Sequence, residues 1–222
     1  MKMINKKIDY IDDPNDTFEQ YLEKAKKYNF RAIFAKPENE YDIAKESLKD
    51  TDIIIAGAID FPEGKMELDE KMKRFEDYAA KNYEEVDYPL NQKNVENKDF
   101  DAIEKEMSTI SQFCKQHNIR DKVIVEMCKL DGDDAAKEKI CEIANRVKPA
   151  FLKTSTGRSF GGAKIEDVKL MKRVLDPAIK IKAAGGIHTY DEAMGFLNAG
   201  ASIMGASAGI KIVEQERDLK NA

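Results

Sequence analysis

Two lysines end short apolar runs in the second half of the chain, where a charged side chain is unusual. Lys153 ends the run in FLKTSTG, and Lys182 ends the run in IKIKAAGG. Low-dielectric surroundings disfavour an ammonium group, and a second ammonium nearby lowers the pKa of the first one further. A neutral lysine amine can attack a carbonyl and form a Schiff base. The pair therefore predicts imine chemistry, with two lysines that merely extend to solvent at strand ends as the alternative.

Two further charged residues, Lys180 and Asp87, bear on the predicted imine chemistry. Lys180 alternates with Lys182 and should share its face of a strand, but it lies deeper towards the start of the run. Asp87, in the run YEEVDYPLN, should point inward because its neighbours Val86 and Tyr88 would face the helices. A carboxylate near two lysines can pair with them or carry protons through a water molecule. A purely structural salt bridge is the alternative for Asp87.

Small residues follow three of the apolar runs. Gly157 closes TSTG, Gly185 and Gly186 precede a helical segment, and Gly205 opens GASAG. Such turns let backbone N–H groups approach an anion, which helix N-termini also favour. Ordinary turns use glycine too, so the pattern predicts a phosphate site only in combination with the fold.

Eight short apolar runs rich in β-branched residues alternate with longer amphipathic segments. The expected strands are residues 7–10, 32–35, 53–58, 85–88, 122–127, 150–153, 179–183 and 202–204. Their nearly continuous apolar character is typical of strands buried on both faces of a parallel sheet. The alternation predicts an α/β protein, a (β/α)₈ TIM barrel forming a single domain over residues 1–222. A doubly wound open sheet is the alternative.

The amphipathic segments between the runs predict helices. Four of them are residues 17–28, 100–117, 165–174 and 189–198. Asp16 or Thr17 is expected to cap the first, and Thr189 with Glu192 three residues later forms a capping-box pattern for the last. In a (β/α)₈ barrel the active site lies at the carboxyl ends of the strands, and a phosphate often binds after strands seven and eight.

The amino-acid composition excludes some classes of binding partner and cofactor. A net charge of −5 argues against nucleic acid and anionic membranes. Three cysteines without CxxC spacing provide no disulfide framework and fit a reducing cytoplasm. Two histidines argue against a His-rich metal site. We expect no cofactor. The first residues, MKMINKKIDYIDD, contain no apolar stretch of signal-peptide length. The sequence is compatible with a homo-oligomer but does not give the oligomeric state.

The motifs together resemble the deoxyribose-phosphate aldolase family, class I aldolases on a (β/α)₈ barrel. The resemblance is carried by FLKTSTG, IKAAGGIHTYDEA and IMGASAGIKIV, and upstream by EEVDYPLN and the Phe-Pro-x-Gly turn at residues 61–64. It extends from about residue 16 to residue 214. It implies reversible cleavage of 2-deoxy-D-ribose 5-phosphate, a sugar phosphate, to glyceraldehyde 3-phosphate and acetaldehyde, without a metal.

The resemblance also implies roles for individual residues. Lys153 matches the Schiff-base lysine, Lys182 the lysine that lowers its pKa, and Asp87 the aspartate of the proton relay. Five residues match positions around the substrate phosphate: Gly157, Gly185, Gly186, Gly205 and Ser207.

This chain departs from the family pattern near the substrate. Residues 10–14 read Tyr-Ile-Asp-Asp-Pro where many members read His-Thr-Leu-Leu-Lys, and only Asp9 before them looks retained. Ala208 replaces a serine of Gly-x-Ser-Ser-Gly, and His188 stands where arginine is frequent, although Arg158 could restore positive charge. Two alternatives therefore stay open: the same imine chemistry on another aldehyde or sugar phosphate, and a catalytically silent barrel that binds one.

Overall fold

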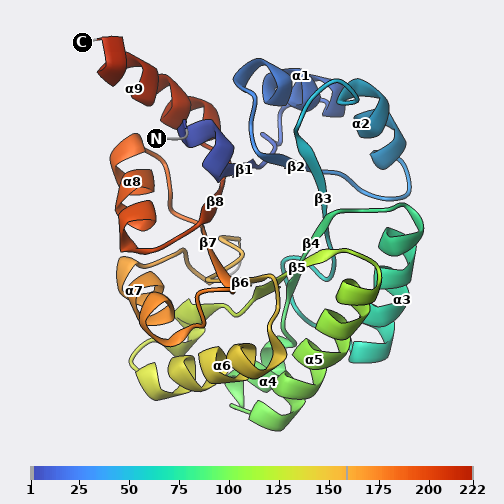
Figure 1. The fold of residues 1–222 in the computed structure, drawn as a ribbon, viewed down its shortest axis with the longest axis vertical. Helices are drawn as coiled ribbons and strands as arrows, with labels where there is room; N and C mark the ends of the chain where they lie inside the picture. The colour runs from blue at the N-terminus through green and yellow to red at the C-terminus, as the bar shows by residue number, and fades with distance from the viewer. Residues whose placement is uncertain (1–2, 159, 222) are drawn as a thin grey trace.

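Eight parallel strands close into a barrel in the computed structural model, which describes residues 3–158 and 160–221 (Figure 1). Each strand pairs with its neighbour in the chain, and β8 pairs with β1. The strands are β1 Ile8–Tyr10, β2 Ala32–Phe34, β3 Ile54–Ala58, β4 Glu85–Pro89, β5 Arg120–Ile124, β6 Phe151–Lys153, β7 Lys180–Ala184 and β8 Ile203–Ala206. The predicted (β/α)₈ barrel is confirmed, and the doubly wound sheet is wrong.

Helices surround this ring of strands on its outer side (Figure 1). They are α1 Phe18–Tyr28, α2 Tyr41–Ser47, α3 Leu68–Ala80, α4 Gln92–Glu96, α5 Phe100–Gln116, α6 Asp134–Val147, α7 Ile165–Val174, α8 Tyr190–Ala199 and α9 Gly209–Asn221, with short 3₁₀ helices η1 Ile4–Lys7 and η2 Met127–Leu130. Two helices begin as predicted, because Thr17 and Thr189 form capping boxes with Gln20 and Glu192. The helix expected at residues 165–174 has those limits.

The fifth strand differs from its expected limits of residues 122–127. It begins at Arg120 and ends at Ile124, and Glu126 takes a left-handed conformation with φ of 63°. The buried carboxylate of Glu126 accepts a 2.6 Å hydrogen bond from the backbone N–H of Thr156 in the loop after β6. This contact between two loops, which the apolar run VIVEM does not reveal, ends the regular strand.

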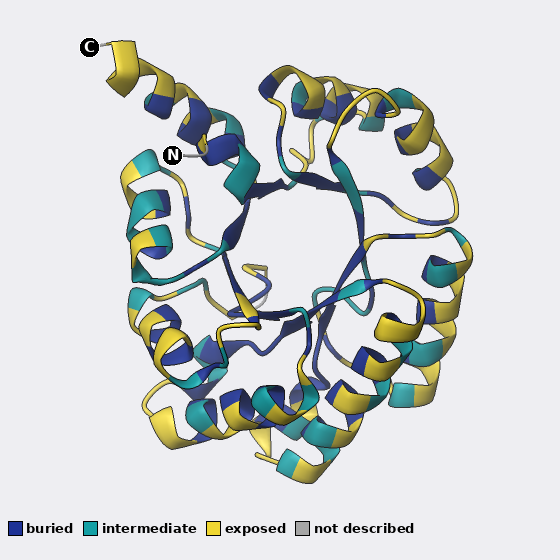
Figure 2. Cartoon of the chain, in the orientation of Figure 1, coloured by how far each residue is buried: buried dark blue, intermediate teal, exposed yellow. Residues whose placement is uncertain are grey.

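The two faces of the β-sheet contact different kinds of side chain. Strands and the inner faces of helices are buried, whereas the outer faces of helices are exposed (Figure 2). Apolar side chains fill the layer between strands and helices; for example, the ring of Phe75 on α3 packs edge-on against Tyr88 on β4, with centroids 5.4 Å apart. The space enclosed by the strands is instead occupied largely by charged side chains, described below.

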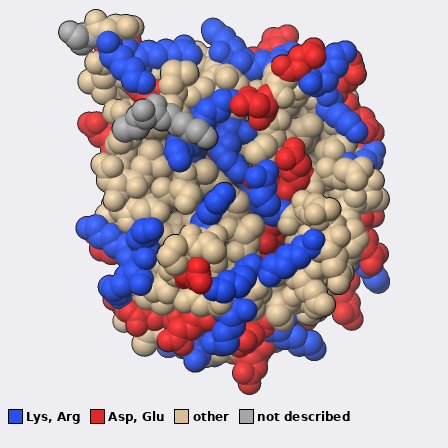
Figure 3. Space-filling model, viewed as in Figure 1, with Lys and Arg blue, Asp and Glu red and all other residues tan. Residues whose placement is uncertain are grey.

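Charge is unevenly spread over the surface. Although the chain carries a net charge of −5, Lys and Arg side chains gather across the middle of the face seen in Figure 3. None of the helices within the described residues combines the length and the apolar character that crossing a membrane would require.

The layer between strands and helices should carry much of the stability. Phe75 is fully buried, so Phe75→Ala should lower the free energy of unfolding by about 3–5 kcal/mol through lost burial and the cavity left behind. Urea denaturation followed by circular dichroism measures this change. Leu219→Ala on α9, where Leu219 is 63% exposed, is the control and should stay within about 0.5 kcal/mol of the unmodified protein. Equal effects of the two substitutions would contradict the prediction.

Candidate active site

Three of the predicted residues meet inside the barrel at its carboxyl-terminal end. Lys153 on β6 and Lys182 on β7 donate to the same oxygen of Asp87 on β4, at 2.7 Å and 2.8 Å. Lys153 and Lys182 are register partners on neighbouring strands, so their side chains rise in parallel on the inner face. The structure thus brings together the lysine pair and the carboxylate that strand-end positions predicted.

Burial and charge both act on the amine of Lys153. Burial is the largest influence, and with the like charges of Lys182 and Lys122 it lowers the pKa of Lys153 to about 8, against the attraction of Asp87. The aromatic ring of Phe61 lies 5.3 Å from the Lys153 nitrogen and helps to keep water away. At neutral pH a useful fraction of this amine is therefore unprotonated, as nucleophilic attack requires.

Asp87 pairs with three lysines. Burial alone would raise its pKa, but Lys122, Lys153 and Lys182 together hold the pKa of Asp87 well below its usual range. Its second oxygen lies 2.9 Å from the Lys122 nitrogen. Asp87 therefore remains ionised across the physiological range and can accept hydrogen bonds from each lysine.

Four further charged residues complete this interior: Asp9 on β1, Arg31 just before β2, Glu85 on β4 and Lys122 on β5. The sequence had pointed to Asp9 through the family pattern, but not to the other three. Asp9, Glu85 and Lys122 are fully buried. Lys122 lies 2.7 Å from Glu85 and 3.1 Å from Asp9. One signal could have found Glu85, because it lies two residues before Asp87 and successive side chains alternate between faces.

Lys180 lies away from this cluster. Its side chain is exposed at the start of β7, and its nitrogen lies 5.6 Å from the ring centroid of Phe151. Strand β7 rises about 3.3 Å per residue, so Lys180 and Lys182 share a face but differ in depth. Lys180 is therefore no part of the buried lysine pair, in agreement with its predicted place nearer the start of the strand.

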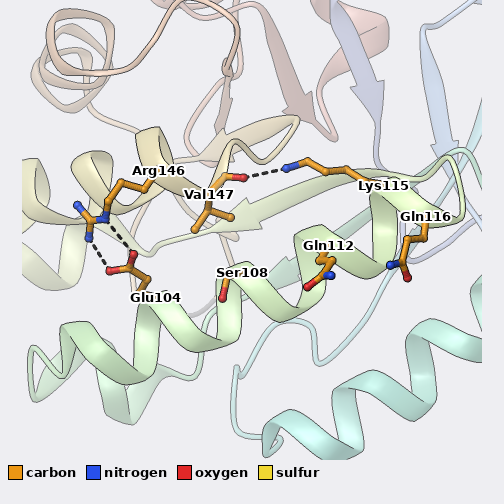
Figure 4. A pocket seen from close by; sticks show the side chains of 7 residues that line it. All are labelled: Glu104, Ser108, Gln112, Lys115, Gln116, Arg146 and Val147. Carbon is orange, nitrogen blue, oxygen red and sulfur yellow. Dashed lines mark hydrogen bonds and ion pairs between the residues drawn. The ribbon is translucent and has the colours of Figure 1, made fainter.

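A hollow of about 500 Å³ opens above Lys153 and Asp87. Its wall includes Phe61, Tyr21 and Arg158 together with residues of the loops after β1 and β2. A second hollow of about 530 Å³ lies outside the barrel, between α5 and the end of α6. Figure 4 shows that its two basic side chains are already engaged, Arg146 with Glu104 and Lys115 with the backbone carbonyl of Val147. Only the first hollow joins enclosed space to a lysine of lowered pKa.

The predicted anion-binding glycines lie at the ends of β6, β7 and β8. Gly157, Gly185 and Gly186 have positive φ values of 74°, 88° and 75°, which favour glycine. A Cβ on Gly157 would lie 2.6 Å from the Cα of Gly185, so these two loops touch through their backbones, whereas a Cβ on Gly186 would meet open space. The structure therefore joins the loops after β6 and β7.

Gly205 and Ser207 have different surroundings. Gly205 is buried, and a Cβ there would lie 3.4 Å from Cε of Lys182, so the small residue leaves room for the lysine stem. Ser207 is exposed just before α9. Among the described residues, His, Cys, Asp and Glu form no group of three or more suited to hold a metal ion.

Relatives of known name are similar in sequence to nearly the whole chain. No family model matches it. A deoxyribose-phosphate aldolase of Lactobacillus acidophilus is 38% identical over 205 residues, covering 92% of this chain and 85% of the relative. One of Caldanaerobacter subterraneus is 38% identical over 217 residues, covering 96% and 93%. The chain belongs to the deoxyribose-phosphate aldolase family. The solved structure of an aldolase, QR15, superposes with a TM-score of 0.85 at 27% identity and full coverage of both chains.

The departures from the family pattern lie around the mouth of the hollow. Ile11 and Asp12, in the altered segment after β1, line it, and Arg158 lies on the same wall. Tyr10 is instead turned into the core, where its ring stacks on Phe30 with centroids 4.4 Å apart. His188 is exposed at the start of α8, and its backbone N–H donates to Glu192. Of the residues that depart from the family pattern, Ile11 and Asp12 therefore lie at the hollow, whereas Tyr10 and His188 lie away from it.

The like charge of Lys182 generates a prediction for the site. Lys182→Met removes a neighbouring positive charge and leaves Asp87 free to pair with Lys153. Both effects favour the ammonium form, so the pKa of Lys153 should rise from about 8 towards ~10.4. Trace acylation at a series of pH values, read by peptide mass mapping, measures the pKa of Lys153. Lys180→Met, which removes an exposed lysine, is the control, and an unchanged pKa in Lys182→Met would mean that burial alone sets it.

Proposed function

We propose that this chain is a class I aldolase that cleaves 2-deoxy-D-ribose 5-phosphate reversibly to glyceraldehyde 3-phosphate and acetaldehyde through a Schiff base on Lys153. The observation that carries the proposal is the shared contact of Lys153 and Lys182 with Asp87, beneath an open hollow. Membership of the deoxyribose-phosphate aldolase family supports the choice of substrate.

The proposed reaction begins with the neutral amine of Lys153. It attacks the C1 aldehyde of the open-chain sugar, and loss of water from the carbinolamine gives a protonated imine. Removal of the proton from the C3 hydroxyl then breaks the C2–C3 bond, and its electron pair passes to the imine. Glyceraldehyde 3-phosphate leaves, the remaining enamine is protonated at C2, and water releases acetaldehyde and the free lysine.

Each neighbouring residue has a proposed part in this sequence. Lys182 adds like-charge repulsion to the effect of burial, and so helps to lower the pKa of Lys153 and to favour its neutral amine. Asp87 moves protons between the carbinolamine, the enamine and a water molecule, because its carboxylate already lies 2.7 Å from the reacting nitrogen. Removing either charge should therefore change the chemistry more than the binding of substrate.

We place the substrate phosphate at the loops after β6, β7 and β8. Gly157, Gly185 and Gly186 present backbone in conformations with positive φ, and Gly205 and Ser207 precede the first turn of α9. Helix N-termini and exposed backbone N–H groups favour an anion. The open space beside Gly186 supports this position.

A different aldehyde or sugar phosphate is the second candidate. Asp12 and Asp16 border the hollow on the β1 side, and Asp12 stands where many members of the family have leucine. Carboxylates favour substrates with hydroxyl groups on that side over those with further anionic groups. Comparing kcat/KM for 2-deoxy-D-ribose 5-phosphate with that for other 2-deoxy aldose phosphates decides between the two candidates.

Reductive trapping tests the covalent step. Incubation with acetaldehyde and borohydride should attach one two-carbon unit to Lys153, because only a neutral amine condenses with the aldehyde. Peptide mass mapping locates the adduct. Lys153→Met should abolish trapping, and Lys180→Met, a change at an exposed lysine, should leave it intact. An adduct on Lys182 or Lys180 in the unmodified protein would overturn the assignment.

Asp87→Asn separates proton transfer from scaffolding. The substitution keeps the shape and removes the charge, so turnover should fall by at least about a hundredfold if Asp87 moves protons. Steady-state kinetics gives the turnover, and chemical denaturation shows whether the variant remains folded. A variant that is less stable but retains near-normal turnover per folded molecule would make Asp87 an ion-pair anchor only.

A further inference from the structure

A continuous cluster of charged side chains runs through the barrel from one end to the other. Its members are Asp9, Arg31, Glu85, Asp87, Lys122, Lys153 and Lys182, and ion pairs connect all of them. The cluster begins at Arg31, at the amino-terminal end of the barrel, and ends at Lys153 beneath the hollow. We call it the interior ion cluster.

The amino-terminal end of the interior ion cluster is held by Arg31. Its guanidinium donates to both oxygens of Glu85 and to Asp9, and its side chain is 13% exposed. Arg120 also reaches Glu85, at 3.1 Å, but its side chain is 41% exposed, so water screens its charge. We therefore count Arg31 as an interior charge and Arg120 as an exterior one.

The lysines of the cluster differ in how many carboxylates they touch. Lys122 contacts Glu85 at 2.7 Å, Asp87 at 2.9 Å and Asp9 at 3.1 Å. Lys182 contacts Asp9 at 2.6 Å and Asp87 at 2.8 Å. Within the described residues, Lys153 pairs with one carboxylate, Asp87, at 2.7 Å. The stabilisation of the ammonium form thus decreases from Lys122 to Lys153.

The interior ion cluster has one more basic group than acidic groups. Arg31 and three lysines face three carboxylates, so full ionisation leaves one excess positive charge in a largely buried cluster. An uncompensated buried charge is costly, and a group that can change protonation does so instead. Lys153, with the fewest carboxylate partners, is the group whose deprotonation balances the cluster.

We propose that Glu85 and Lys122, which do not line the hollow, determine the protonation state of Lys153 by setting the charge balance of the interior ion cluster. They are positioning residues that act through Asp87 and Asp9, and the consequence for catalysis rests on the function proposed above. The prediction is directional. Removing the positive charge of Lys122 should favour the ammonium form of Lys153, and removing the negative charge of Glu85 should disfavour it.

The charged residues around the mouth of the hollow affect the protonation of Lys153 less than the interior ion cluster does. The hollow above Lys153 is bordered by Asp12, Asp16, Lys36, Glu40 and Arg158. Asp12, Lys36 and Arg158 are exposed, and Asp16 and Glu40 are half-buried, with Asp16 paired to Lys24 at 2.6 Å. Water in the open mouth screens these groups far more than it screens charges enclosed by the strands.

The test is the pKa of Lys153 in two opposed variants of the full chain, measured by trace acylation over a pH series with peptide mass mapping. Lys122→Met should raise the pKa of Lys153, and Glu85→Gln should lower it, each by about one unit. The double variant Glu85→Gln/Lys122→Met loses one charge of each sign and should return close to the unmodified protein. A merely structural role would lower the free energy of unfolding without these opposite shifts.

A matched control exists outside the barrel. Lys137 on α6 is also a buried, paired lysine, 4% exposed and 2.6 Å from Asp167. Lys137→Met should therefore reduce stability and leave the pKa of Lys153 unchanged. If Lys122→Met does not fold, Arg31→Gln removes a positive charge from the same cluster and should also raise the pKa.

The measurement separates this inference from the proposed function. Folded variants whose Lys153 pKa values are unchanged, or shift in the same direction, would overturn the inference. Opposite shifts support it whether or not acetaldehyde is trapped, because acylation reports on the amine alone. Absence of an acetaldehyde adduct on Lys153 in the unmodified protein would refute the proposed function instead.

Discussion

The carboxylate of Asp87 is the contact on which the interior of the barrel depends. One of its oxygens accepts from Lys153 and Lys182, and the other faces Lys122. Three ammonium groups on three strands would repel one another strongly in a low-dielectric space. A single ionised carboxylate among them allows the lysines to lie close together, so their geometry is set by β4 as much as by β6 and β7.

The closed barrel makes such a cluster attainable. Alternation along each strand sends apolar side chains towards the helices and the charged ones inward. The register of β4 with β5 pairs Asp87 with Lys122, and that of β6 with β7 pairs Lys153 with Lys182. A slip of one residue in either pair would turn a charge into the apolar layer, so closure and the apolar layer together keep the lysines aligned.

The sequence predicted the barrel, its eight strands, and Lys153, Lys182 and Asp87, because each of these charges interrupts or ends an apolar run. It did not point to Lys122, Glu85 or Arg31. Each lies at or just before the polar start of a strand, where a surface charge looks the same in sequence. Asp9 on β1 contacts Lys122 on β5 and Lys182 on β7 across the barrel. A local sequence pattern does not indicate which strands face each other across a barrel. The end of β5 was missed for a similar reason, since Glu126 accepts a hydrogen bond from Thr156, which lies in another loop.

The backbone contact between Gly157 and Gly185 has a consequence for anyone who redesigns this protein. A Cβ on either glycine would lie 2.6 Å from the Cα of the other, and a Cβ on Gly162 would lie 2.5 Å from the carbonyl oxygen of Gly185. The loops after β6 and β7 are therefore one interlocked unit rather than two modules. A graft that replaces one loop with a relative's sequence must carry its counterpart along, because the surfaces that meet are bare main chain and leave no side chain to absorb a mismatch.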